Sequence, residues 1–177
     1  MELKRRCFLK RSTAAAMVLL ASPKVFAHVE TERRIGFSNQ HTGELVDAVY
    51  WADGQYVPDE LARINHVLRD HRTDDIFPIE PGLLDVLHNL RRLTGLAKPF
   101  DLVSGYRSPK TNAMLHETTK GVAKKSFHMM GMAADVWIAG YDLRRLRDAA
   151  VSLKAGGVGY YAKSGFIHVD IGRTRYW

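Results

Sequence analysis

The sequence predicts an α+β domain in which helices pack on one side of a small antiparallel sheet. Two observations favour this class. Most segments with the spacing of helices come first and most segments with the alternation of strands follow, instead of the two kinds alternating one by one. The last two predicted strands are separated only by a short turn, the usual connection of an antiparallel pair. About 150 residues are enough for one domain with one core.

The first half of the domain is predicted to contain two strands followed by two helices. Residues 34–39 and 44–51 are strand-like and are joined by a polar turn that ends in a glycine. A helix is expected to begin at Pro58, because apolar residues then recur every three or four positions. A second helix, over residues 81–93, carries four leucines on one side and is ended by Gly95.

The second half is predicted to contain most of the sheet. Helices are expected at residues 109–118 and 143–154, and a lysine-rich loop at residues 119–127. Short apolar or alternating runs bounded by glycine and polar residues predict the strands. These strands are residues 100–103, 132–138, 157–161 and 166–171.

Residues 1–27 are typical of an export signal of the twin-arginine type. A basic head with the string Arg-Arg-x-Phe-Leu-Lys, beginning at Arg5, precedes an apolar run, and Val25-Phe26-Ala27 suits a signal peptidase. The apolar run is shorter than the roughly 20 residues that cross a bilayer. An uncleaved anchor or a disordered basic tail is the alternative. We therefore expect a mature domain of residues 28–177 in the periplasm, without stable membrane insertion.

Charge and cysteine content narrow the function classes once the signal is set aside. The chain has 26 basic and 19 acidic residues, of which six and one lie in residues 1–27. Residues 28–177 therefore carry a net charge of only +2, without a basic stripe interleaved with aromatic residues, which argues against nucleic acid as a partner. The only cysteine, Cys7, is removed with the signal, so the exported domain has no disulfide.

Two histidines and a carboxylate stand on short apolar segments late in the chain. Because side chains alternate along a strand, Asp135 and His168 each lie on a face opposite apolar residues. His128 precedes Gly131, a residue that permits a tight turn into the Asp135 strand. If the three side chains meet, they offer the ligand set of a catalytic zinc; spacing alone leaves open that they are ordinary core or surface residues. For the other histidines of the domain we expect solvated or packing roles; they include His41, His66, His71, His88 and His116.

Three motifs together resemble the zinc D-alanyl-D-alanine peptidase superfamily and, within it, the murein endopeptidases. They are Ser104-Gly105-Tyr106-Arg107-Ser108-Pro109, Ser126-x-His128-x-x-Gly131-x-Ala133-x-Asp135 and Phe166-Ile167-His168-Val169-Asp170. Segments at residues 39–44, 121–126 and 155–161 and the final Arg-Tyr-Trp add to the likeness, which covers essentially all of residues 28–177. The resemblance implies the hedgehog/D-Ala-D-Ala peptidase fold.

The resemblance also implies roles for individual residues. His128, Asp135 and His168 would bind one Zn²⁺ per chain, with water as the fourth ligand. Arg107 resembles the family arginine that stabilises an oxyanion or binds a substrate carboxylate, with a structural salt bridge as the alternative.

The chain departs from the family pattern at the general base. Many members carry an acidic residue or a histidine shortly before the last zinc histidine, whereas residues 164–167 are Ser-Gly-Phe-Ile and cannot take a proton at neutral pH. Asp170 is the best remaining candidate for a catalytic role. It would act either as the base or by holding the His168 ring in place.

The function implied is a zinc-dependent murein endopeptidase that acts in cell-wall remodelling. Its substrates would be peptide cross-links of peptidoglycan, between two diaminopimelate residues, between D-alanine and diaminopimelate, or both. A D-Ala-D-Ala-type carboxypeptidase and a non-catalytic peptidoglycan-binding module on the same fold are the alternatives. The expected partners are anionic stem peptides. Lysines that flank the site in sequence would attract them or belong to a solvated loop; they are Lys110, Lys120, Lys124 and Lys125.

Overall fold

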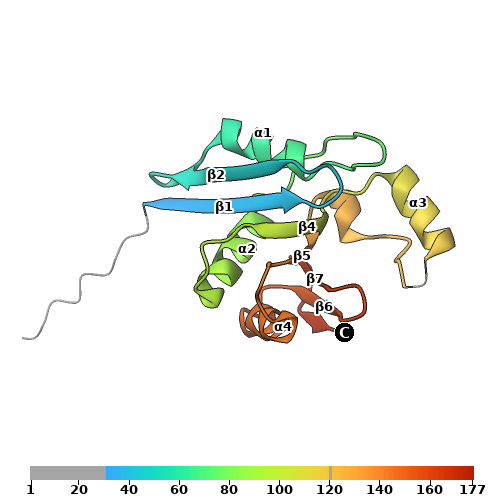
Figure 1. The fold of residues 1–177 in the computed structure, drawn as a ribbon. Helices are drawn as coiled ribbons and strands as arrows, with labels where there is room; N and C mark the ends of the chain where they lie inside the picture. Colours follow the sequence, from blue (N-terminus) through green and yellow to red (C-terminus); the bar gives the residue numbers. More distant parts are fainter. Residues whose placement is uncertain (1–30, 120) are drawn as a thin grey trace, which may run out of the picture.

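The computed structural model describes residues 31–119 and 121–177 as one sheet with helices packed against it (Figure 1). Within these residues eight strands lie in the order β3-β2-β1-β4-β5-β7-β6-β8. The strands are β1 (Glu32–Asn39), β2 (Leu45–Ala52), β3 (Gln55–Tyr56), β4 (Phe100–Ser104), β5 (Ala133–Trp137), β6 (Gly157–Tyr161), β7 (Phe166–Asp170) and β8 (Arg175–Tyr176). The helices are α1 (Pro58–Val67), α2 (Pro81–Thr94), α3 (Pro109–Thr118), α4 (Leu143–Ser152) and the 3₁₀ helix η1 (Phe127–Met130). The predicted export signal and Lys120 lie outside the described residues.

The predicted α+β class is confirmed, but the sheet is larger than expected and mixed. β1 pairs with β4 in parallel, because the chain between them crosses over through α1 and α2. β8 lies parallel to β6, since the turn after β7 reverses the chain and carries it past β6 to the edge of the sheet. Sequence periodicity did not predict β3, η1 and β8. Each has only two to four residues, too few for a repeat to show.

One face of the sheet forms the core together with the helices. The alternate residues Ala134, Val136, Ile167 and Val169 of β5 and β7 are buried in a single apolar cluster that also includes residues of α1, α2 and α4. The leucines of α2 predicted to share one side are all buried there. The opposite side chains of β5 and β7 are thus left free to build a site on the other face.

The helix ends carry residues that commonly cap helices. Asp142 and Ser108 cap α4 and α3 by accepting hydrogen bonds from the backbone N–H groups of Arg145 and Thr111. Gly95 ends α2 in the left-handed conformation, with φ of 68°. Among the described residues, none of the helices has both the length and the apolar character needed to cross a membrane.

Candidate metal centre

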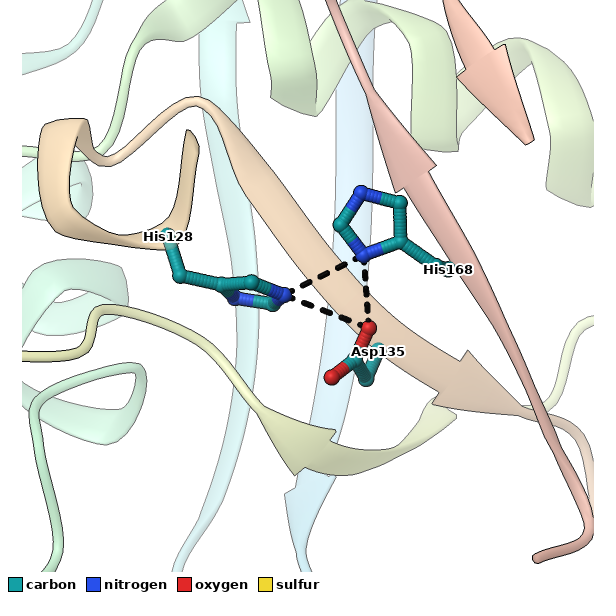
Figure 2. A group of neighbouring side chains, drawn as sticks. All are labelled: His128, Asp135 and His168. Carbon is teal, nitrogen blue, oxygen red and sulfur yellow. Dashed lines mark hydrogen bonds and ion pairs between the residues drawn. The ribbon is translucent and has the colours of Figure 1, made fainter. Parts of the chain in front are cut away.

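The structure brings the three predicted ligands together from three separate elements. His128 comes from η1, Asp135 from β5 and His168 from β7, and one ligand atom of each lies within 4.8 Å of the others. Figure 2 shows both rings pointing toward the carboxylate. His168 Nδ1 is 2.8 Å and His128 Nε2 3.3 Å from Asp135 Oδ1, and the two nitrogens are 3.2 Å apart.

Strand pairing accounts for two of the three positions. β5 and β7 are antiparallel neighbours in which Asp135 and His168 are direct cross-strand partners, so their side chains leave the same face at the same level. The predicted alternation of these strands is confirmed. Both side chains are buried or nearly so, as is that of His128.

A tight turn delivers His128. Ser126 caps η1 by accepting a hydrogen bond from the backbone N–H of His128, and Gly131 ends η1 with φ of 66°. A Cβ at Gly131 would collide with the carbonyl oxygen of Pro78, so this position requires glycine for two reasons. The turn predicted at Gly131 is therefore present, and it folds η1 back over β5.

Hydrogen bonds on the far side of each ring determine which nitrogen is available to a metal. His128 Nδ1 is 2.7 Å from the carbonyl oxygen of Gly105, which can only accept, so Nδ1 carries the proton and Nε2 presents its lone pair to the site. His168 Nε2 lies 3.0 Å from the carboxylate of Asp170, so Nε2–H donates and Nδ1 is the free nitrogen.

The charges within the cluster shift its titration. Burial alone would raise the pKa of Asp135, but the adjacent His128 and His168 hold it well below its usual range. Burial would lower the pKa of His168, whereas hydrogen bonds to Asp135 and Asp170 raise it to about 9. The carboxylates therefore keep their negative charge and attract a cation.

The donor set fits Zn²⁺. Two imidazole nitrogens and one carboxylate oxygen are the ligands that catalytic zinc sites use, with a further position left for water or substrate. Metal binding would require the His168 ring to give up its Nδ1 proton; with Nε2–H donating to Asp170, all three ligand atoms are then unprotonated on the side that faces the site.

Arg107 lies beside the cluster at the end of β4. Its Nη2 is 3.6 Å from Asp135 Oδ2 and 3.3 Å from the hydroxyl of Ser104. Burial lowers the pKa of the guanidinium, and the charge of Asp135 opposes the shift. Its Nε is buried without a hydrogen-bond partner among the described residues. The residue lines the cleft over the cluster, where its positive charge can act on an anion that enters.

Asp170 is in contact with the cluster but on the far side of the His168 ring. The side chain is fully buried and receives N–H groups from Gly157, Gly172 and Arg175 in addition to His168. Burial works against its negative charge, yet these donors hold its pKa well below the usual range. Of the two roles considered for Asp170, this geometry favours orienting the ring over taking a proton from the reacting face.

A cleft of about 720 Å³ opens over the cluster. His128, Asp135 and His168 lie in its wall together with Arg107, Tyr161 and Trp177. Of the lysines expected to flank the site, Lys125 lines the cleft. Tyr106, next to Arg107 in the sequence, does not line the cleft; it is buried and stacks on Phe77.

The other histidines in the described part of the chain have solvated or packing roles, although His41 also lies at the cleft. His88, His116 and His66 bond to Arg34, Val122 and Glu44 respectively. His41 stacks on His71 at 3.8 Å between ring centroids, and it also lines the cleft.

Sequence reasoning missed three contributors to the site. They are Gly105, which supplies a backbone carbonyl, and Arg175 and Trp177, which lie beyond the last predicted strand. A backbone acceptor leaves no trace in residue types. The final Arg-Tyr-Trp contributes to the family resemblance, but no periodic pattern indicates that it lies near the histidines.

The chain is similar to known proteins along nearly its whole length. Residues 27–177 match the family model described as "Peptidoglycan L,D-endopeptidase MepK". The chain is similar to proteins of that name from Escherichia coli (strain K12) and Shigella flexneri, each 43% identical over 98% of this chain and 96% of the relative. It is also 36% identical to the "Probable peptidoglycan L,D-endopeptidase MepK" of Haemophilus influenzae, over 98% of this chain and 95% of the relative.

Proposed function

The chain belongs to the family described as peptidoglycan L,D-endopeptidase MepK, and we propose that it hydrolyses peptide cross-links of peptidoglycan with one Zn²⁺ held by His128, Asp135 and His168. It is a peptidoglycan endopeptidase of a zinc-dependent metallopeptidase family. One observation carries the assignment of the ligands. Three buried ligand atoms on three elements lie within 4.8 Å of one another, and each histidine is hydrogen-bonded through the ring nitrogen that faces away from the site.

When bound, zinc supplies a Lewis acid that polarises a peptide carbonyl and makes water more acidic. The chain's own residues supply the remaining electrostatics. Arg107 lines the cleft, and its guanidinium N–H donors would stabilise the negative charge that develops on the carbonyl oxygen. Because Arg107 is buried, it offers these donors with little loss of side-chain freedom.

Asp170 acts in this proposal as a positioning residue. Its carboxylate accepts the Nε2–H of His168, which keeps the proton on that nitrogen and directs Nδ1 toward the metal. The residues that precede His168 and line the cleft, Ser164 and Phe166, carry no group that accepts a proton at neutral pH. These positions before His168 therefore supply no general base, and the charge of Arg107 would lower the barrier to attack on the carbonyl.

The scissile bond follows from the stereochemistry in the relatives' name. An L,D-endopeptidase acts on a bond from an L-centre to a D-centre, and of the two cross-links considered only the one between two diaminopimelate residues has this configuration. We therefore propose this cross-link as the substrate. The link between D-alanine and diaminopimelate, a D,D bond, is the competing substrate that the experiment must include.

Digestion of purified sacculi that contain both cross-links tests the proposal. The wild-type chain should convert the diaminopimelate–diaminopimelate dimers to monomers, as identified by mass spectrometry, and a chelator should stop the reaction. His128→Ala should reduce the rate by about 10²–10⁴-fold, because several kcal/mol of electrostatic stabilisation would be lost with the metal. His66→Ala is the matched control, since this exposed histidine lies on α1 outside the cleft.

Each alternative has its own product pattern. Release of single D-alanine from monomeric stem peptides would identify a carboxypeptidase. Binding to sacculi without any released fragment would identify a non-catalytic module. Hydrolysis that continues after complete removal of zinc would refute the metal assignment itself.

The periplasm is the compartment that this substrate requires, and we propose export by the twin-arginine route. Its support is the string that begins at Arg5 and Arg6. Replacing both arginines by lysine should leave the precursor in the cytoplasm, where fractionation and immunoblotting would detect it. Periplasmic accumulation of that variant would exclude the route while leaving the peptidase assignment untouched.

A further inference from the structure

Arg175, at the start of β8, holds the carboxylate that orients His168. Its Nη1 and Nη2 donate to the two oxygens of Asp170 at 3.0 and 2.7 Å, a two-point contact between a guanidinium and a fully buried carboxylate. Asp170 Oδ2 in turn accepts from His168 Nε2 at 3.0 Å. Arg175, Asp170 and His168 thus form a chain of charged hydrogen bonds that ends at the ligand nitrogen.

Two aromatic rings hold the guanidinium in place. Its central carbon lies 4.9 Å from the centroid of Trp177 and 5.3 Å from that of Phe127. Phe127 directly precedes His128 in η1. The Trp177 ring lies 5.4 Å from His168, and its Nε1 donates to the hydroxyl of Tyr161 at 3.0 Å. Arg175 therefore contacts the immediate surroundings of both histidine ligands.

Three glycines provide the room for this cluster. A Cβ at Gly157 would collide with the Arg175 and Asp170 side chains, and a Cβ at Gly159 would collide with the Trp177 indole. A Cβ at Gly172 would collide with the ring of Phe127. Because a side chain at any of these three glycines would overlap with the cluster, the packing around Arg175 is tightly constrained.

We propose that Arg175 is a positioning residue of the metal centre, acting through Asp170 on His168. The inference rests on the proposed function, because it takes His168 to be a metal ligand. Without the fork, the Asp170 carboxylate would lose its two-point guanidinium contact and could rotate away from Nε2. His168 would then lose the contact that directs Nδ1 into the site.

Zinc affinity of the purified full chain, measured by competition with a chromophoric chelator, tests this role directly. Arg175→Ala should weaken zinc binding by about 10–100-fold, the usual cost of losing an outer-shell partner of a metal ligand. Arg175→Lys keeps the charge but not the fork and should lie between the two. Arg173→Ala is the matched control, an exposed arginine in the same turn, and should bind zinc as the wild type does.

Cobalt substitution gives a readout that a merely structural role would not move. If Arg175 orients His168, the visible absorption of bound Co²⁺ should change in Arg175→Ala and return toward the wild-type spectrum in Arg175→Lys. Loss of thermal stability in Arg175→Ala with zinc affinity and the cobalt spectrum unchanged would overturn the proposal, since Arg175 would then only fasten β8 to β6.

A double-mutant cycle with Asp170→Asn tests the route of the effect. If Arg175 acts through Asp170, the double variant should bind zinc about as weakly as Asp170→Asn alone, because coupled residues are not additive. Additive losses would contradict the proposed chain. His168→Ala distinguishes the ligand assignment from the role of Arg175. If that variant binds zinc normally, the ligand assignment fails; if it loses zinc while the Arg175 variants do not, only the present inference fails.

Discussion

At the scale of single residues, each histidine of the metal centre is restrained at the nitrogen that faces away from the ligand cluster. A backbone carbonyl restrains His128 and a carboxylate restrains His168. The two restraints differ in kind. A side-chain substitution cannot remove the backbone carbonyl of Gly105, whereas it can remove the carboxylate of Asp170. Variants of Asp170 are therefore the more direct way to test how much ring orientation contributes to metal affinity.

Arg107 should affect catalysis without affecting metal binding. Arg107→Lys keeps a positive charge but loses the planar fork, and we expect kcat to fall by about 10²–10³-fold, the usual cost of one preorganised donor to an oxyanion. Steady-state kinetics on a purified cross-linked dimer, with zinc content measured in parallel, would check this. Equal losses of zinc affinity and activity would instead indicate that Arg107 serves as a salt bridge to Asp135.

At the scale of elements, the turn that ends η1 is the most demanding local structure near the site. Gly131→Ala should destabilise the fold by more than the roughly 1–2 kcal/mol that left-handed backbone costs other residues, because its Cβ also meets Pro78. Gly43→Ala is the matched control, with φ of 73° and open space around it. Denaturant unfolding of both variants measures the difference, and equal losses would mean that the contact with Pro78 relaxes freely.

Asp70 links the connector after α1 to the start of α3. This carboxylate is buried and accepts from the backbone N–H groups of Arg72 and Ser108. Burial raises its pKa, but hydrogen bonds from Thr111, Ser108 and the backbone outweigh that effect and bring the pKa to about 2. Because the folded state has the lower pKa, Asp70 stabilises the fold above about pH 4, and this contribution disappears as the pH falls toward 2.

Asp70→Asn should therefore reduce the free energy of unfolding by about 2 kcal/mol at pH 7 and by much less near pH 2. Denaturant titrations of wild type and variant at several pH values would measure the convergence. Glu117→Gln, an exposed carboxylate on α3, serves as the control. A difference that stays constant down to pH 2 would show that the charge of Asp70 does not contribute.

At the scale of the whole molecule, the sheet joins the site to the core. β5 and β7 bury one set of side chains against α2 and α4 and present the other set to the cleft, so the same strands carry stability and function. A ligand that binds only the folded chain must therefore stabilise the entire domain.

Zinc should accordingly raise the melting temperature. At a free zinc concentration 100 times the Kd, the gain of about 2.7 kcal/mol corresponds to a rise of about 5–10 °C for a domain of this size. Calorimetry with zinc and with chelator measures it. Asp135→Asn, which removes one ligand charge, should abolish most of the shift. An unchanged melting temperature in the wild type would count against a site that forms only in the folded state.

The sequence by itself determined the local features of this protein. Alternation along residues 132–138 and 166–171 separated Asp135 and His168 from the apolar residues that form the core, and helical spacing located α1 and α2. The glycine before β5 marked the turn that His128 needs. These features depend on neighbours a few residues apart, so patterns within one segment are sufficient to predict them.

Only the tertiary structure decided which segments meet. The placement of β4 beside β5 brings Arg107 to the cluster, and the approach of Gly105 fixes the His128 tautomer. The return of β8 along β6 brings Arg175 to Asp170. None of these contacts has a local pattern, because each depends on the pairing and packing of segments that are distant in the sequence or too short to show a period. Alternation could show which side of its strand His168 occupies, but only packing could favour one of the two roles considered for Asp170.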